Sequence, residues 1–143
     1  MGLSVVAHVD GGSRGNPGPA AAGVVVSAAD DGTVLFEGGY FLGRATNNVA
    51  EYHGLLKALD AARRLGADEV SIRSDSELMV RQMNGEYRVK NAGLKPLFEQ
   101  ASGAARSFRK FDIRHVRRQQ NVDADRLANQ AMDLKRNVED AAE

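Results

Sequence analysis

Residues 8–19, HVDGGSRGNPGP, restrict the possible folds more than any other stretch of the chain. An apolar run over residues 3–9 is interrupted by Asp10 and passes at once into a loop rich in glycine and proline. Such clusters mark turns, and ligands of open α/β sheets bind beyond the carboxyl ends of the strands. The sequence therefore predicts a strand that ends at Asp10 and presents this acid at a ligand-binding sheet edge.

Length, charge and cysteine content narrow the class of protein. A chain of 143 residues is long enough for one domain with a real core, which we expect at residues 1–136. The polar tail at 137–143 is expected to fray or to begin a linker to a further domain. The 19 basic residues balance the 19 acidic ones, which excludes a globally basic nucleic-acid-binding protein. Cysteine, a signal peptide and a long apolar run are all missing, so we expect a cytoplasmic protein without disulfides or membrane segments.

A local basic patch nevertheless occupies residues 106–118, where Asp112 is the one acid. Its basic residues are Arg106, Arg109, Lys110, Arg114, Arg117 and Arg118. A run of this kind is either an ordinary solvated surface or a contact for nucleic-acid phosphates. The sequence by itself leaves both interpretations open.

Hydrophobic periodicity predicts an α/β fold with five strands and four helices. The predicted strands span residues 3–10, 20–29, 33–42, 69–74 and 110–116, and the predicted helices span residues 48–65, 76–83, 94–107 and 122–135. The turn at residues 30–32 makes the second and third strands an antiparallel hairpin. The helix before the fourth strand makes that strand a parallel neighbour of the first, by a right-handed crossover.

Acidic residues fall at comparable places in these elements. Asp10 and Asp75 follow adjacent parallel strands, and Glu51 lies in the first turn of a helix, on its apolar stripe. An acid on the buried side of a helix is costly unless something pairs with it. Asp123 and Asp125 flank the apolar stripe of the last helix, and periodicity leaves open which of them faces the sheet. Taken singly, each acid is also explained as a helix cap or a solvated residue.

Taken together, the acids predict a metal site. Carboxylates gathered closely raise one another's pKa values and repel unless divalent cations are bound. Hard carboxylate oxygens, without cysteine or a histidine cluster, favour Mg²⁺ or Mn²⁺ over zinc. Two such ions about 3.5 to 4 Å apart activate a water molecule and stabilise the leaving oxygen in phosphodiester cleavage. This is the chemistry that the pattern favours.

Four blocks of the sequence resemble the successive signature blocks of the type 1 ribonuclease H family. In chain order they are DGGSRGNPGPAAAGVV, RATNNVAEYHGLLKAL, SDSELMVRQMNGEYRVKNAGLKPL and HVRRQQNVDADRLANQA, which together span nearly the whole chain. The resemblance implies a ribonuclease H-like fold, in which a mixed five-stranded sheet of order 3-2-1-4-5 carries helices on both faces. It also implies endonucleolytic cleavage of the RNA strand of an RNA/DNA hybrid, with 5′-phosphate and 3′-hydroxyl products.

The same resemblance implies a catalytic, metal-binding set of four carboxylates, with two Mg²⁺ or Mn²⁺ ions when substrate is bound. The implied set is Asp10, Glu51, Asp75 and Asp125. The family's last aspartate lies in the AD-x-LA block, which selects Asp125 and leaves Asp123 as a helix-start residue. In such enzymes the first aspartate bridges both ions and the last holds the ion that activates water. The glutamate and the middle aspartate complete the second site.

Substrate contacts follow partly from chemistry and partly from the resemblance. The implied substrate-binding residues are Gly11, Gly12, Ser13, Arg14, Gly15, Asn16, Arg44, Thr46, Asn47, Asn48, Ser76 and Asn91. A glycine loop lacks bulk, so its backbone, with the asparagine pair at 47–48, can approach a sugar and sense the 2′-OH of RNA. Arg44, Thr46 and Asn91 match family positions that hold a DNA-strand phosphate. Each is otherwise explained as a loop or cap residue, and Asn91 as a helix N-cap.

The chain departs from the family pattern between its last strand and last helix. Many members carry a glycine-flanked histidine loop there, which assists product release or proton transfer, whereas this chain has residues 117–121 alone. Arg117 or Arg118 is the better candidate for an auxiliary role at the leaving phosphate. His115 is expected to be a packed or partly buried strand residue rather than a catalytic one.

A second departure follows the helix at 76–83, where many members insert a basic helical protrusion. The short connection GEYRVKNAG resembles archaeal and actinobacterial forms, so Arg88, Lys90 and the basic patch are candidates for gripping the hybrid. In some actinobacterial relatives a phosphatase-like domain follows this one. We expect a monomer whose partner is an RNA/DNA hybrid, with double-stranded RNA as a further candidate partner. The alternatives are a non-catalytic binding module for hybrid or double-stranded RNA, a junction-resolving DNA nuclease and a phosphotransferase of another substrate class.

Overall fold

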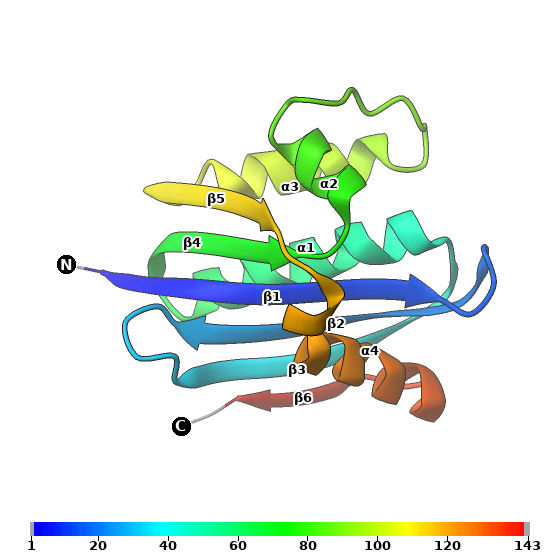
Figure 1. The fold of residues 1–143 in the computed structure, drawn as a ribbon, viewed down its shortest axis with the longest axis horizontal. Helices are drawn as coiled ribbons and strands as arrows, with labels where there is room; N and C mark the ends of the chain where they lie inside the picture. The colour runs from blue at the N-terminus through cyan, green and yellow to red at the C-terminus, as the bar shows by residue number, and fades with distance from the viewer. Residues whose placement is uncertain (1, 142–143) are drawn as a thin grey trace.

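A six-stranded mixed sheet forms the middle layer of the molecule, in the order β5-β4-β1-β2-β3-β6 (Figure 1). The computed structural model describes residues 2–141, and residues 1, 142 and 143 lie outside this description. The elements are β1 (Leu3–Ser13), β2 (Gly18–Ala28), β3 (Val34–Ala45), α1 (Asn47–Arg64), β4 (Ala67–Ser74), α2 (Glu77–Met83), α3 (Lys95–Ala105), β5 (Lys110–His115), the 3-10 helix η1 (Arg118–Gln120), α4 (Val122–Leu134) and β6 (Val138–Ala141).

The predicted order of the first five strands is confirmed. β1 pairs antiparallel with β2 and parallel with β4, and β4 pairs parallel with β5. Helices cover both faces, as predicted: α4 lies in front of the sheet, whereas α1 and α3 lie behind it (Figure 1). Apolar residues of β1, β4 and α1, such as Val9, Ile72 and Leu55, fill the core between the sheet and α1.

The prediction of five strands was wrong by one, because part of the expected polar tail forms β6. This strand runs antiparallel along β3, with pairs from Gly39↔Val138 to Phe36↔Ala141. The chain reverses at Lys135, which has a left-handed backbone (φ 54°), and Asn137 accepts a hydrogen bond of 2.9 Å from the Phe41 amide. An edge strand offers unpaired backbone groups to any neighbouring segment, so a polar stretch can pair there. Residues 142 and 143 of the predicted tail lie outside the described residues.

β1 also continues past Asp10, where the sequence predicted its end. Its pairing with β4 stops at Val9↔Ser74, but its pairing with β2 continues to Ser13↔Ala20. The strand is thus supported on one side alone from Asp10 onward, because β4 has turned toward α2 by then. This free edge leaves room for other elements to approach Asp10.

Glycines let the helices lie close to the sheet. A Cβ atom on Gly23 of β2 or Gly39 of β3 would overlap the carbonyl oxygens of Ala124 and Leu127 in α4. The first turns of α4 therefore rest directly on the backbones of β2 and β3. Among the described helices, none combines the length and the apolar character that crossing a membrane requires.

Candidate active site

Carboxylates from separate elements meet beside the free edge of β1. Ligand oxygens of Asp10, Glu51 and Asp75 all lie within 4.8 Å of one another. Asp125, in the first turn of α4, lies close enough to Asp10 to raise the pKa of that carboxyl. All four acids line one pocket of about 410 Å³. The structure therefore brings the four carboxylates of the predicted set together.

The electrostatics of this pocket disfavour charge in the metal-free protein. Burial raises the pKa of Asp10 to about 8, and Asp75 and Asp125 add to the rise, partly offset by the Gly11 backbone amide. Burial, followed by the charges of Asp10 and Asp75, also raises the pKa of Glu51. The buried Oε1 atom of Glu51 has no hydrogen-bond partner. A cluster of hard oxygens, one of them unpaired, fits a divalent cation such as Mg²⁺ or Mn²⁺.

Close contact between β1 and α1 places Glu51 beside Asp10. A Cβ atom on Gly11 would overlap the main chain at Ala50 and Glu51, so the two backbones touch there. Thr46 caps α1, since its side chain accepts a hydrogen bond of 3.3 Å from the Val49 amide. Thr46 therefore has the cap role that the sequence offered as one of its two explanations.

The predicted sugar-sensing loop is tied to the start of α1. The Ser13 amide donates to Asn47 Oδ1 at 2.8 Å, and the Asn47 amide donates to Asn16 Oδ1 at 3.0 Å. Gly15 has a φ of 102°, a backbone conformation that residues other than glycine rarely adopt. Asn48 is exposed in the first turn of α1. The members of the predicted substrate set that line the acid pocket are Gly11, Gly12, Ser13, Arg14 and Asn47.

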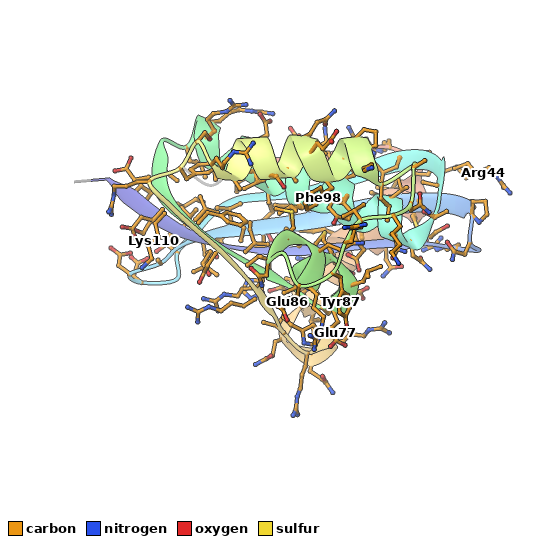
Figure 2. The ribbon with its side chains drawn as sticks, turned by 90° about the horizontal axis from the view of Figure 1, so that it is seen from above. Arg44, Glu77, Glu86, Tyr87, Phe98 and Lys110 are labelled. Carbon is orange, nitrogen blue, oxygen red and sulfur yellow. The ribbon has the colours of Figure 1, made fainter. Side chains whose placement is uncertain are left out.

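The predicted phosphate-holding residues lie outside the acid pocket. Arg44 is exposed and points away from the body of the molecule at the end of β3 (Figure 2). Asn91 is exposed, and its side chain accepts a hydrogen bond of 2.7 Å from the Gly93 amide. The explanation of Asn91 as a helix N-cap was wrong, because Leu94 occupies that position before α3. Ser76 caps α2, accepting from the Met79 amide at 3.3 Å.

The structure separates the two auxiliary candidates. Arg118 Nε lies 3.8 Å from Asp75 Oδ2, with an arginine side chain that is 87% exposed and an aspartate side chain that is 13% exposed. Arg117 is exposed and does not line the acid pocket. Asp123 lines a different pocket, together with His8.

His115 was expected to be packed or partly buried, and this was wrong, because the residue is exposed. It ends β5, which is an edge strand, two residues after the buried Ile113. The basic patch is partly neutralised: Arg109 pairs with Glu69, and Arg114 pairs with Asp112 at 2.9 Å. Such pairs weaken the interpretation of the whole patch as a phosphate contact.

The connection between α2 and α3 contains no helix within residues 84–94. Glu77, Glu86 and the exposed Tyr87 gather around α2, and Phe98 lies on the neighbouring α3 (Figure 2). Both glutamates form ion pairs with Arg81, at 2.9 and 3.1 Å. Arg81 is therefore occupied by two acidic partners and is not free to contact a phosphate.

Two asparagines near the acids were missed by sequence reasoning. Asn129 lines the acid pocket, and its side chain donates to the Asp125 carbonyl at 3.0 Å. Its position four residues after Asp125, on the same helix face, was a usable signal. Asn121 is buried between η1 and α4, in a segment that the sequence predicted to be a loop.

Comparison with known proteins places the chain in a family. The profile of the reverse transcriptase-like family matches residues 8–131. The bifunctional protein Rv2228c of Mycobacterium tuberculosis is 53% identical over 131 residues, which are 92% of this chain and 36% of that protein. The chain thus spans about a third of the length of this curated relative. The solved N-terminal RNase H domain of Rv2228c has a TM-score of 0.89, at 52% identity over 92% of this chain and 95% of that one.

Two further structures are similar over nearly their whole length. RNase H1 of the archaeon Halobacterium salinarum has a TM-score of 0.88 at 44% identity, covering 91% of this chain and 98% of that one. LC11-RNase H1, isolated from compost by a metagenomic approach, was solved in complex with an RNA/DNA hybrid. Its TM-score is 0.87 at 40% identity, covering 92% of this chain and 99% of that one. The resemblance inferred from the four sequence blocks is confirmed, and the chain belongs to the reverse transcriptase-like family, in its type 1 ribonuclease H branch.

Proposed function

We propose that the chain is a metal-dependent endoribonuclease that cleaves the RNA strand of RNA/DNA hybrids and leaves 5′-phosphate and 3′-hydroxyl ends. The observation that carries this proposal is the meeting of four carboxylates, from β1, α1, the end of β4 and α4, in one pocket. The relative LC11-RNase H1, which has been solved with a bound hybrid, supports the choice of substrate.

Asp10, Glu51, Asp75 and Asp125 would hold two Mg²⁺ or Mn²⁺ ions. When bound, such ions activate a water molecule and stabilise the leaving oxygen of a phosphodiester. The pKa of Asp10, raised to about 8, means that this carboxyl holds a proton at neutral pH in the metal-free protein, and burial raises the pKa of Glu51 in the same direction. Metal binding would therefore release protons, because the ligands must be deprotonated.

The chain's own residues would orient the substrate around this pocket. The bonds from Ser13 to Asn47 and from Asn47 to Asn16 hold the loop against α1, so its backbone groups are fixed before an RNA sugar arrives. Arg118, beside Asp75, would offset phosphate charge near the leaving group. Arg44, Thr46 and Asn91 are proposed to hold a DNA-strand phosphate at a distance from the acids.

A non-catalytic binding module is the main rival. A protein that only binds nucleic acid gains affinity from basic side chains beside the phosphates. Carboxylates at the docking site would instead repel the phosphates. Four acids in the pocket, two with raised pKa values, therefore favour metal-assisted cleavage over simple binding. A DNA nuclease or a phosphotransferase would use the same metal-binding carboxylates. The substrate that is cleaved distinguishes these alternatives from the proposed ribonuclease.

The test compares end-labelled RNA/DNA, RNA/RNA and DNA/DNA duplexes with Mg²⁺, with Mn²⁺ and with EDTA. We expect cleavage of the RNA strand in the hybrid with either metal, no cleavage in EDTA, and product ends that a ligase requiring 5′-phosphate accepts. Asp10→Asn should abolish cleavage while leaving the far-ultraviolet circular dichroism unchanged, because it removes a ligand but little volume. Cutting of the DNA duplex alone, or hybrid binding without cleavage in either metal, would overturn the proposal.

A further inference from the structure

Asn121 is a buried polar residue that the proposed chemistry does not use. It is 1% exposed and lies between η1 and α4, at the N-cap position of the helix that carries Asp125. A buried carboxamide costs free energy unless it is hydrogen-bonded. Its bonds therefore indicate what the residue does in the fold.

The side chain of Asn121 is bonded to β1 immediately before Asp10. Its Nδ2 atom donates to the Val9 carbonyl at 2.6 Å, across 112 residues of sequence. Val9 is the last β1 residue that pairs with β4. The bond thus supports β1 where the parallel neighbour stops and where Asp10 enters the pocket.

The main chain of Asn121 is hydrogen-bonded to two residues that line the acid pocket, Asp125 and Arg118. Its carbonyl accepts from the Asp125 amide at 3.1 Å, which is a bond of the first turn of α4. Its amide donates to the Arg118 carbonyl at 2.9 Å, which closes η1. One residue therefore connects the strand that carries Asp10 with the segments that carry Asp125 and Arg118.

An ordinary capping role does not account for this side chain. An asparagine at an N-cap normally accepts a hydrogen bond from a backbone amide of the first turn. Asn121 makes no side-chain cap bond, and its Oδ1 atom is buried without a partner. The carboxamide of Asn121 therefore bonds to β1, and the first turn of α4 receives no hydrogen bond from it.

We propose that Asn121 is a positioning residue that fixes Asp10 relative to Asp125, and with them the geometry of the metal site. This inference rests on the proposed function, because it concerns the same four carboxylates. Asp10 and Asp125 come from opposite ends of the sequence and from different layers of the fold. The Asn121 side chain thus adds a direct hydrogen bond between the start of α4 and the β1 main chain beside Asp10.

The test measures Mn²⁺ binding by calorimetry, with substrate-free protein well below its melting temperature. Asn121→Leu keeps a similar side-chain volume but removes the donor, and Asn121→Ala removes both. We expect each variant to bind Mn²⁺ about tenfold more weakly, the loss typical of residues that orient metal ligands. Hybrid affinity in EDTA should stay within about twofold of the parent, and kcat should fall more than KM rises.

Asn84→Ala is the matched control. Asn84 Nδ2 donates to the Ile113 carbonyl at 3.3 Å, which is also a bond from an asparagine at a helix end to a strand carbonyl. The Asn84 bond joins the end of α2 to β5, and neither of these elements contributes a residue to the acid pocket, so Mn²⁺ affinity should stay within about twofold. If Asn121→Leu binds Mn²⁺ as tightly as the parent, Asn121 merely fills space and the inference is wrong. If the parent itself binds no Mn²⁺, the proposed function fails as well.

A measurement on the parent protein does not depend on how the variants fold. In labelled protein, the side-chain amide of Asn121 should show a scalar coupling to the Val9 carbonyl and slow exchange with solvent. The side-chain amide of Asn84, which lies at the surface, should exchange faster. Equal exchange at the two sites, together with no coupling to Val9, would overturn the inference.

Discussion

Gly11 of β1 and Ala50 of α1 are in direct backbone contact, so close that a Cβ atom on Gly11 would overlap the Ala50 carbonyl group. This contact places the first turn of α1 directly on the face of β1 next to Asp10. Glu51 follows Ala50 and thereby reaches the side of Asp10. Because Gly11 has no side chain, the Glu51 carboxylate can lie close to the Asp10 carboxylate.

Gly11→Ala should therefore separate β1 from α1. We expect a loss of stability of about 1 to 3 kcal/mol, typical of overpacking, because two backbones must move apart. The proposed metal site should weaken with it, so Mn²⁺ affinity should fall about tenfold or more. Chemical denaturation and calorimetry measure the two effects.

Gly103→Ala provides the contrast within α3. A Cβ atom there would meet no heavy atom closer than 4.0 Å, from Arg106. Alanine is favoured over glycine in a helix by roughly 0.5 to 1 kcal/mol, so this variant should be more stable than the parent. Unchanged Mn²⁺ affinity in Gly11→Ala would show that the contact does not set the site.

Most of the predicted carboxylates that the structure brings into one pocket had a local signal in the sequence. Asp10 interrupts an apolar run, Asp75 follows an apolar strand, and Glu51 lies on an apolar helix stripe, so periodicity indicated the place of each of them. Asp125 needed the family resemblance, because its stripe position did not distinguish it from Asp123. Periodicity also predicted the first five strands, whereas their full order in the sheet came from the family resemblance.

The parts that were missed depend on backbone pairing and on distant partners. β6 has a polar sequence, and it pairs with β3 because an edge strand offers backbone groups that do not depend on side chains. Asn121 lies in a short polar segment, and its partner Val9 is remote in the sequence. β1 continues past Asp10 because β2 still pairs with it, which no local pattern indicates.

The stability of the metal-free protein should fall as pH rises from about 4 to about 8. Asp10 has an ordinary pKa of 3.8 when unfolded and a pKa of about 8 when folded, so the folded state binds more protons in this range. Above pH 4, folding must overcome the free-energy cost of burying Asp10, and Asp10→Asn removes this cost because asparagine does not ionise. Because one pKa unit corresponds to about 1.4 kcal/mol, the variant should be more stable than the parent by more than about 1 kcal/mol at pH 8 in EDTA.

Near pH 3.5 the two proteins should be equally stable, since Asp10 is then largely protonated in both states. Urea denaturation at pH 3.5, 6 and 8 measures the difference. Glu51→Gln should behave in the same direction, because burial also raises the pKa of Glu51. Added Mg²⁺ should stabilise the parent more than Asp10→Asn. A parent that gains stability over Asp10→Asn between pH 6 and 8 in EDTA would contradict the raised pKa.

Arg118→Ala should lower kcat for hybrid cleavage by about tenfold. This is a smaller loss than the removal of a buried hydrogen-bond donor to the transition state typically causes. The guanidinium lies beside Asp75, but its side chain is largely in solvent, so it can meet a phosphate without holding the fold. Mn²⁺ affinity in the absence of substrate should not fall. Single-turnover and steady-state rates separate an effect on chemistry from one on product release. Arg117→Ala, which alters a residue outside the acid pocket, should have the smaller effect, and the reverse order would reassign the auxiliary role.

Arg44→Ala should weaken hybrid binding and reduce its dependence on salt. Arg44 is exposed and extends outward from the end of β3, where a duplex bound over the acids could bring a phosphate to it (Figure 2). Each phosphate contact adds about one to the slope of log Kd against log salt concentration, so the variant should lose about one. Binding is measured in the Asp10→Asn background, where the RNA strand stays intact. Arg63→Ala removes the same charge at the opposite end of α1, where Arg63 lies 3.9 Å from Asp60, and should leave the slope unchanged. Equal slopes for Arg44→Ala and the Asp10→Asn background would place the DNA-strand phosphate elsewhere.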